Sequence, residues 1–90
     1  MINDELLGTV AGLVKEQGAS EQLVSALRVR WPNLRFTYCS DDDMPPRLSP
    51  ALAGEGFNLY LIANGDHCLA LTKDPAVAIG VVVAEVMADE

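Results

Sequence analysis

Apolar residues change their spacing at Pro32, and this change limits which folds the chain can adopt. Before Pro32 they recur every three or four positions, which is the period of an amphipathic helix. After it, residues 34–40 alternate between apolar and polar, which is the period of a half-buried strand. Helices and strands therefore occupy separate stretches of the chain, and we expect an α+β fold.

Two helices are predicted before Pro32. Asn3 can cap the first helix, and Gly18 is suited to the left-handed residue that ends it. Ser20 can cap a second helix over about residues 21–31, which Pro32 prevents from continuing. The short link between the two helices indicates an antiparallel helical hairpin.

Three strands are predicted after the helices. The first covers residues 34–40, and residues 41–46 follow it as a loop, because they combine three aspartates with two prolines that cannot donate backbone hydrogen bonds. Residues 47–56 contain a proline and two glycines and are expected to be mostly irregular. Residues 57–63 and 66–72 form the other two strands.

The last two strands are expected to form a hairpin. Asn64-Gly65 is the strongest short signal for a two-residue type I′ turn, because both central residues of that turn need positive φ. Such a turn pairs Ile62 with His67 and Leu61 with Cys68. Both faces of the hairpin then carry large apolar side chains.

A last helix is predicted over residues 75–88, with Asp74 as its N-cap and Pro75 as its first residue. The predicted fold is thus α+β, with a helical hairpin, a three-stranded antiparallel sheet and a C-terminal helix, in the order α-α-β-β-β-α. A chain of 90 residues suffices for one small hydrophobic core. Residues 1–90 are therefore expected to form a single domain.

Acidic residues outnumber basic residues by 13 to 6, and the net charge is −7. This charge has the wrong sign for binding to nucleic acid or to anionic lipid. The N-terminus is acidic and lacks the basic and apolar regions of a signal peptide, and no apolar run approaches the roughly 20 residues that span a bilayer. We therefore expect a cytoplasmic protein that binds neither nucleic acid nor membranes.

The sequence carries no motif that identifies a catalytic site. It lacks a phosphate-binding loop, a nucleophile elbow and a dinucleotide fingerprint. We therefore expect a protein that is not an enzyme and that uses no cofactor.

Hydrophobic residues make up 50% of the chain, which is more than the predicted helices can readily cover. A homodimer would bury the remaining apolar surface, because exposed apolar patches usually mark interfaces. The alternative is a monomer whose last helix lies across the sheet. The dimer contact would use a stripe of the last helix or the hairpin face formed by Tyr60, Ile62, Leu69 and Leu71.

Asp41, Asp42 and Asp43 are the first candidates for contact with a partner protein. Clustered carboxylates repel one another, so they would gain from meeting arginine or lysine side chains of a partner. Tyr60 and His67 complete the predicted partner-binding surface. Within the chain or across a dimer, the acidic loop could also pair with a basic patch formed by Arg28, Arg30 and Arg35.

A metal site is the alternative interpretation. Cys39, His67 and Asp41 offer soft and hard ligands suited to zinc or another transition ion, provided that the first strand pairs with the hairpin in a suitable register. His67 and Cys68 cannot serve one metal together, because neighbours on a strand point to opposite faces. The competing interpretation makes His67 a half-exposed hairpin residue and Cys68 a buried structural thiol.

Three parts of the sequence resemble a known family: residues 36–45, the two hairpin stretches 56–61 and 66–72, and residues 80–86. They are similar to an uncharacterised family of small acidic proteins, which nitrogen-fixing bacteria usually encode within nitrogen-fixation gene clusters. The resemblance covers nearly the whole chain and brings no catalytic motif. It implies a cytoplasmic location and a link to nitrogen fixation, through the maturation or protection of metalloenzymes.

These observations together predict a non-enzymatic accessory protein that acts by protein–protein interaction. The alternative is a metal-binding or metal-delivery protein that uses Cys39, His67 and a neighbouring aspartate. A third hypothesis is a small-ligand pocket between the sheet and the helices.

Overall fold

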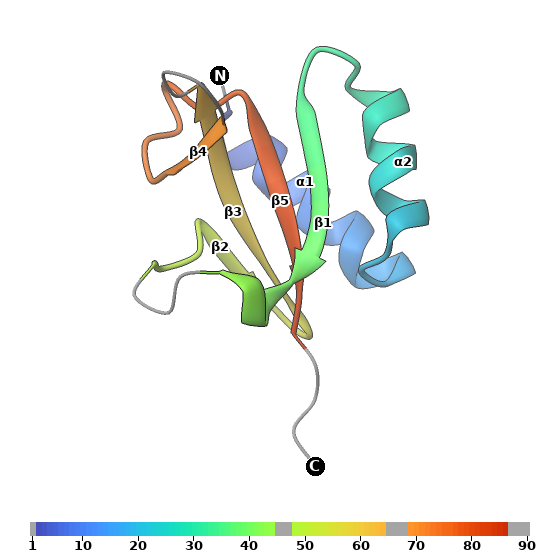
Figure 1. The fold of residues 1–90 in the computed structure, drawn as a ribbon. Coiled ribbons are helices and arrows are strands. Elements are labelled where there is room, and N and C mark those ends of the chain that lie inside the picture. Colours follow the sequence, from blue (N-terminus) through green and yellow to red (C-terminus); the bar gives the residue numbers. More distant parts are fainter. Residues whose placement is uncertain (1, 45–47, 65–68, 87–90) are drawn as a thin grey trace.

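The computed structural model describes residues 2–44, 48–64 and 69–86, and it shows two helices packed on one face of a mixed β-sheet (Figure 1). The helices are α1 (Asp4–Gln17) and α2 (Glu21–Arg30). The strands are β1 (Arg35–Ser40), β2 (Leu52–Gly54), β3 (Phe57–Asn64), β4 (Leu69–Thr72) and β5 (Gly80–Glu85), and a 3-10 turn, η1 (Asp41–Asp43), follows β1.

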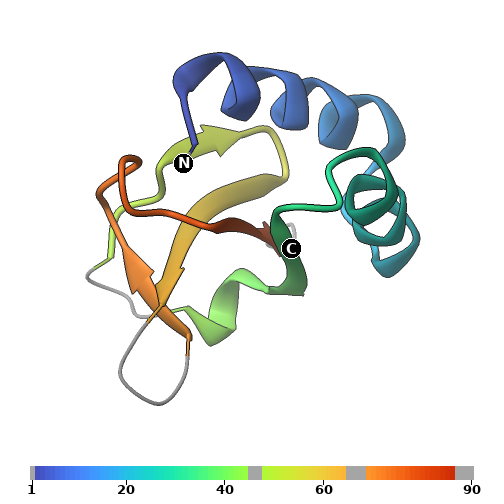
Figure 2. The ribbon, with the colours of Figure 1, turned by 90° about the horizontal axis from the view of Figure 1, so that it is seen from above.

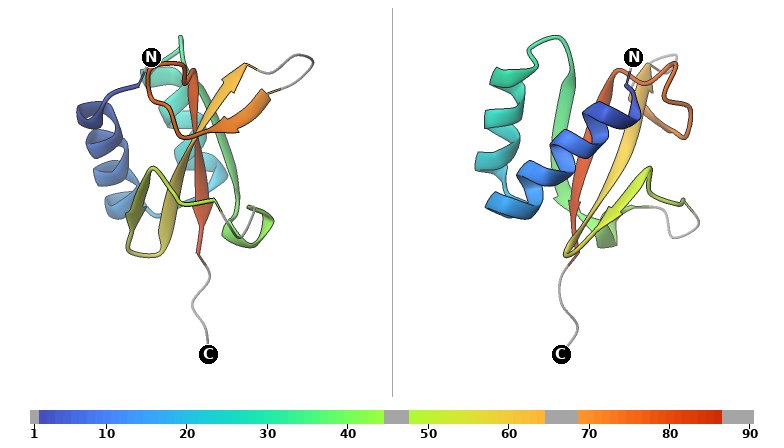
Figure 3. Two further views of the ribbon diagram at one scale, coloured as in Figure 1. Left: turned by 90° about the vertical axis from the view of Figure 1, so that its left-hand side faces the viewer. Right: turned by 180° about the vertical axis from the view of Figure 1, so that it is seen from behind.

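Both predicted helices are confirmed, and their caps explain their bounds. The Asn3 side chain accepts a hydrogen bond from the backbone N–H of Leu6 at 2.7 Å, and α1 ends at Gly18, which has φ +86°. The Ser20 hydroxyl accepts one from the N–H of Leu23 at 3.1 Å. Seen from behind, α1 crosses the strands diagonally and α2 runs back beside β1 (Figure 3). Neither helix is long and apolar enough to cross a membrane.

The sheet differs from the predicted three-stranded antiparallel one. Its strand order is β1-β5-β3-β2, and β4 also pairs with β3. β1 runs parallel to β5, whereas all other pairs are antiparallel. β2 pairs with the first half of β3 and β4 with its second half, so the segment expected to be irregular supplies a short strand.

The predicted C-terminal helix is wrong, because its residues form strand β5 in the middle of the sheet. Asp74 does cap a turn: its side chain accepts a hydrogen bond from the N–H of Ala76 at 3.0 Å. The turn does not continue as a helix, because the following run is rich in β-branched valines and pairs with β1 on one side and β3 on the other. Every residue from Gly80 to Ala84 is buried, as expected for a strand covered on both faces.

The predicted two-residue hairpin turn is also wrong. Asn64 belongs to β3, where it pairs with Leu69, and no described residue other than glycine has positive φ. Leu61 therefore pairs with Thr72 instead of Cys68. A shift by four residues is even, so it leaves the described residues of β3 and β4 on their predicted faces. The connection itself, residues 65–68, lies outside the described residues.

Each face of the sheet has its own apolar cluster. The larger one fills the space between the sheet and the helices, with α1 over β2 and β3 and α2 against β1 (Figure 2). The smaller one lies on the opposite face, on the side where η1 is seen in Figure 2. The buried members of this second cluster are Tyr60, Ile62, Val82 and Ala84.

Candidate functional site

The three aspartates follow β1 directly and form the turn η1 in front of the sheet face that the helices leave open (Figure 1). The hydroxyl of Ser40 accepts a hydrogen bond from the N–H of Asp42 at 3.3 Å, and the N–H of Met44 donates to the backbone carbonyl of Asp41 at 3.1 Å. These two bonds close the turn, so the segment predicted as a loop has a defined conformation.

Asp41 anchors this turn to β3. Its Oδ1 accepts hydrogen bonds from Asn58 Nδ2 at 3.0 Å and from the Tyr60 hydroxyl at 2.9 Å. Asn58 and Tyr60 are two residues apart on one strand, so both side chains point to the same face of the sheet. Burial, followed by the hydrogen bond to Asp41, raises the pKa of Tyr60, which keeps its hydroxyl protonated as the donor.

The three carboxylates of η1 differ in their burial and in their contacts. Asp41 is half-buried because it turns toward the sheet, whereas Asp42 and Asp43 are exposed. The side chains of Asp42 and Asp43 are thus held on a short turn, and the hydrogen bonds of Asp41 fix the position of that turn. Tyr60, a predicted contact residue, is only 5% exposed and lies behind Asp41.

Two apolar residues that follow η1 cover part of the second apolar face. Met44 and Leu48 pack against the cluster that contains Tyr60 and Ile62, each of which is 5% exposed. The hairpin face on which a dimer was expected is therefore covered in part by the chain itself. Leu71 of the same predicted face is 37% exposed, and the homodimer stays a prediction.

Cys39 lies on the same face, with its Sγ 3.6 Å from Met44 Sδ. Burial raises the pKa of the Cys39 thiol, and the carboxylates of Asp43 and Asp41 raise it further, because negative charges disfavour a thiolate. Since the thiolate is the reactive form, this environment does not activate Cys39 as a nucleophile.

The structure brings together only part of the predicted metal set. Cys39 and Asp41 lie at the same end of the sheet, whereas His67 falls outside the described residues, as does Cys68. Over residues 2–44, 48–64 and 69–86, no group of three or more histidine, cysteine, aspartate or glutamate side chains could hold a metal ion. The described geometry therefore gives the metal hypothesis no support of its own.

Two arginines of the predicted basic patch, Arg28 and Arg30, have partners outside η1. Arg28 donates from Nε and Nη2 to the backbone carbonyl of Phe36, at 3.1 and 2.9 Å. The Arg30 guanidinium lies 4.8 Å from the centre of the Trp31 ring, which is the distance of a cation–π contact. These arginines thus have their own partners near β1 and α2.

Sequence reasoning missed two polar residues at this end of the sheet. Asn58 is the second anchor of Asp41, and Glu85 accepts a hydrogen bond from the Tyr38 hydroxyl on the helix-covered side. This bond, followed by burial, raises the pKa of Tyr38. The alternation of β3 places Asn58 and Tyr60 on one face, but only the strand order shows that η1 crosses that face.

The sequence profile of a family of unknown function (DUF6129) matches residues 10–86. This match spans most of the chain, so the chain belongs to that family. Comparisons with curated proteins and with solved structures found no similar protein.

Proposed function

We propose that this family member is a non-enzymatic accessory protein that presents the acidic turn η1 to a basic surface of a partner protein. The proposal rests on the different environments of the three aspartates of the turn. Asp41 is held by Asn58 and Tyr60, which leaves the exposed Asp42 and Asp43 in a fixed place. A preformed turn loses less conformational entropy on binding than a flexible acidic loop would.

Charge gives the second argument. The chain has net charge −7, so a partner with a basic surface is attracted over a long range, and the association rate falls as salt screens this attraction. Exposed charges at the rim of an interface act mainly on the association rate and on specificity. The turn is therefore suited to recognising a partner. High affinity would need further contacts beside those of the turn.

The resemblance of residues 36–45 and 80–86 to small acidic proteins of nitrogen-fixing bacteria supports a cellular setting for the proposal. In that setting the protein acts in the cytoplasm, and its partner takes part in the maturation or protection of a metalloenzyme. Nitrogen-fixing cells are accordingly the material in which the partner is to be sought.

The test is affinity capture from extracts of nitrogen-fixing cells with the double variant Asp42→Asn, Asp43→Asn. Two exposed ion pairs contribute about 0.2–1 kcal/mol each, which is about 0.4–2 kcal/mol together, so capture should fall roughly two- to thirtyfold. Quantitative mass spectrometry of the captured proteins at low and at physiological salt measures the change. The wild-type chain should also lose more of its capture on addition of salt than the double variant does.

The matched control is the double variant Glu5→Gln, Glu16→Gln. It removes the same formal charge from exposed positions on α1, on the other side of the sheet. It should capture the partner as the wild-type chain does. An equal loss in both double variants would show that net charge alone drives capture, and no loss in the Asp42, Asp43 variant would remove η1 from the proposal.

A further inference from the structure

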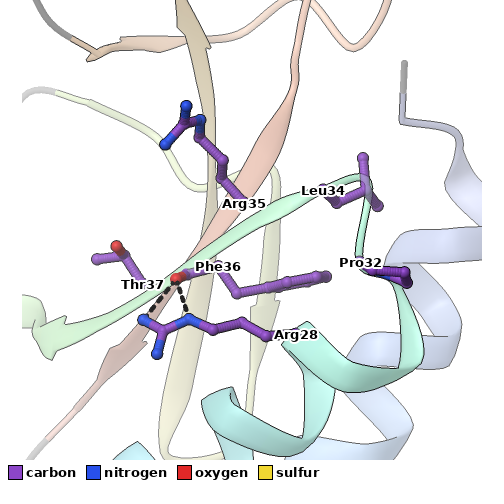
Figure 4. Close-up of a pocket in the computed structure, with 6 residues that line it drawn as sticks. All are labelled: Arg28, Pro32, Leu34, Arg35, Phe36 and Thr37. Atoms are coloured by element: carbon purple, nitrogen blue, oxygen red, sulfur yellow. Dashed lines mark hydrogen bonds between the residues drawn. The ribbon is translucent and has the colours of Figure 1, made fainter.

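The sheet face that the helices leave open carries opposite charges at its two ends. Side chains alternate between the two faces along a strand. Phe36 lies in the cluster under the helices and Cys39 packs on the open face, so Arg35, four residues before Cys39, lies on the open face too. Figure 4 shows the Arg35 side chain directed away from those of Arg28 and Phe36. An exposed cation therefore marks the start of β1, whereas the acidic turn η1 follows its end.

The strand register shows which residues share each end of this face. One row across the sheet consists of Arg35, Gly80, Ile62 and Leu71. A second row, four residues further along β1, consists of Cys39, Ala84 and Asn58. η1 crosses the second row, where Asp41 accepts the hydrogen bond from Asn58. The first row thus presents an exposed arginine and a leucine that is 37% exposed, and the second row lies behind η1.

The two ends are too far apart to form an ion pair within one chain. Four residues of a strand span about 13 Å, whereas the charged atoms of an ion pair lie within about 4 Å. Side chains stand roughly perpendicular to a sheet, so the length of the Arg35 side chain does not close this gap. Arg35 and the exposed carboxylates of Asp42 and Asp43 can therefore each meet a group of another molecule.

A second copy of the chain that is turned end for end matches this pattern. A two-fold axis that lies in the plane of the contact, across the strands, places the η1 of each copy over the first row of the other. Both contacts then join carboxylates to an arginine. Figure 1 shows η1 in front of the lower end of the strands, so each η1 would stand over the end of the other copy that carries no η1.

We propose that the open face binds a second copy of this chain in this two-fold arrangement. Asp42 and Asp43 of each copy meet Arg35 of the other, and Leu71 packs within the contact. Charges of both signs on one face favour a second copy over a uniformly basic partner protein, whose charge would oppose Arg35 if it covered the whole face. The inference goes beyond the proposed function, because a partner protein would then have to displace the second copy from η1.

The first test is sedimentation equilibrium of the purified chain. At low salt the wild-type chain should show a monomer–dimer equilibrium, and added salt should weaken the dimer because it screens the ion pairs. Arg35→Glu should raise the dissociation constant of the dimer at least about tenfold, because it places like charges in both contacts. The double variant Asp42→Arg, Asp43→Arg should do the same. Circular dichroism checks that both variants are folded.

An equal mixture of these two variants should restore the dimer, with a dissociation constant within about threefold of the wild-type value. In the mixed dimer one contact keeps the native charges, and the other has both signs exchanged. The matched control is Arg30→Glu, which makes the same change of net charge on α2, outside the open face. It should form dimers as the wild-type chain does.

A wild-type chain that stays monomeric at millimolar concentration would overturn the proposal, as would a mixture no more dimeric than its two components alone. Equal weakening by Arg30→Glu and Arg35→Glu would show that net charge governs self-association, and it would overturn the assignment to the open face. These measurements need no partner protein. A monomeric chain would therefore leave the part of η1 in partner capture unaffected.

Discussion

Truncation of Leu59 to alanine is expected to lower the free energy of unfolding by about 3–5 kcal/mol. Leu59 is 0% exposed in the middle of β3, where it pairs with Val83 of β5 and with Leu52 of β2. Its side chain also belongs to the cluster under the helices, so the lost methyl groups leave a cavity that several elements share. Urea denaturation followed by circular dichroism measures the change.

A loss of this size is a large part of the total stability of a domain, which is about 5–15 kcal/mol. The control is Val29→Ala on α2, because Val29 is also apolar but 82% exposed, and its change should stay within about 0.5 kcal/mol. Similar losses in the two variants would contradict the packing described for β3.

Replacing Gly80 by alanine should lower the free energy of unfolding by about 2–3 kcal/mol. A Cβ atom at this position would lie 2.2 Å from the backbone carbonyl oxygen of Arg35, so β1 and β5 would have to move apart. This close approach follows from the parallel pairing of Arg35 with Gly80. Thermal and urea denaturation both report the loss.

The same substitution at Gly12 is the control and should have the opposite sign. Gly12 lies within α1, and a Cβ atom there would meet nothing within 4 Å. Alanine in place of a helical glycine stabilises by about 0.5–1 kcal/mol. If Gly80 were in a helix, as its sequence context suggested, Gly80→Ala would stabilise the protein as well. Equal signs at the two positions would therefore contradict the assignment of β5.

Local signals were sufficient for the first third of the chain. Asn3, Gly18 and Ser20 act on backbone groups within a few residues of themselves, so their effect can be predicted without knowing the rest of the fold. The change to strand spacing after Pro32 is also local, and β1 begins within one residue of its predicted start.

The strand β5 shows where local signals fail. Asp74 and Pro75 are typical of a helix start, and the Asp74 side chain does cap a turn. A short apolar run fits a buried helix and a buried strand equally well, so the period of the sequence does not decide between them. The decision comes from β1 and β3, which lie far away in the sequence and pair with both edges of β5.

The residue types of the candidate site could be predicted from the sequence, but their arrangement in space could not. The three aspartates stand out in the sequence, yet nothing in their spacing separates Asp41 from Asp42 and Asp43. The difference arises because the parallel pairing of β1 with β5 places η1 across β3, within reach of Asn58 and Tyr60. The sequence interpretation counted Tyr60 as a surface residue, whereas this contact buries it.

Photo-crosslinking tests directly whether η1 contacts a partner. A chain with the photoreactive p-benzoylphenylalanine in place of Asp43 keeps Asp41 as the anchor and Asp42 as a recognition charge, and a second chain carries it in place of Glu16 on α1. If η1 contacts the partner, irradiation in extracts of nitrogen-fixing cells joins the partner captured by the wild-type chain to position 43, and not to position 16. Adducts of that partner at position 16 alone would contradict contact between η1 and the partner.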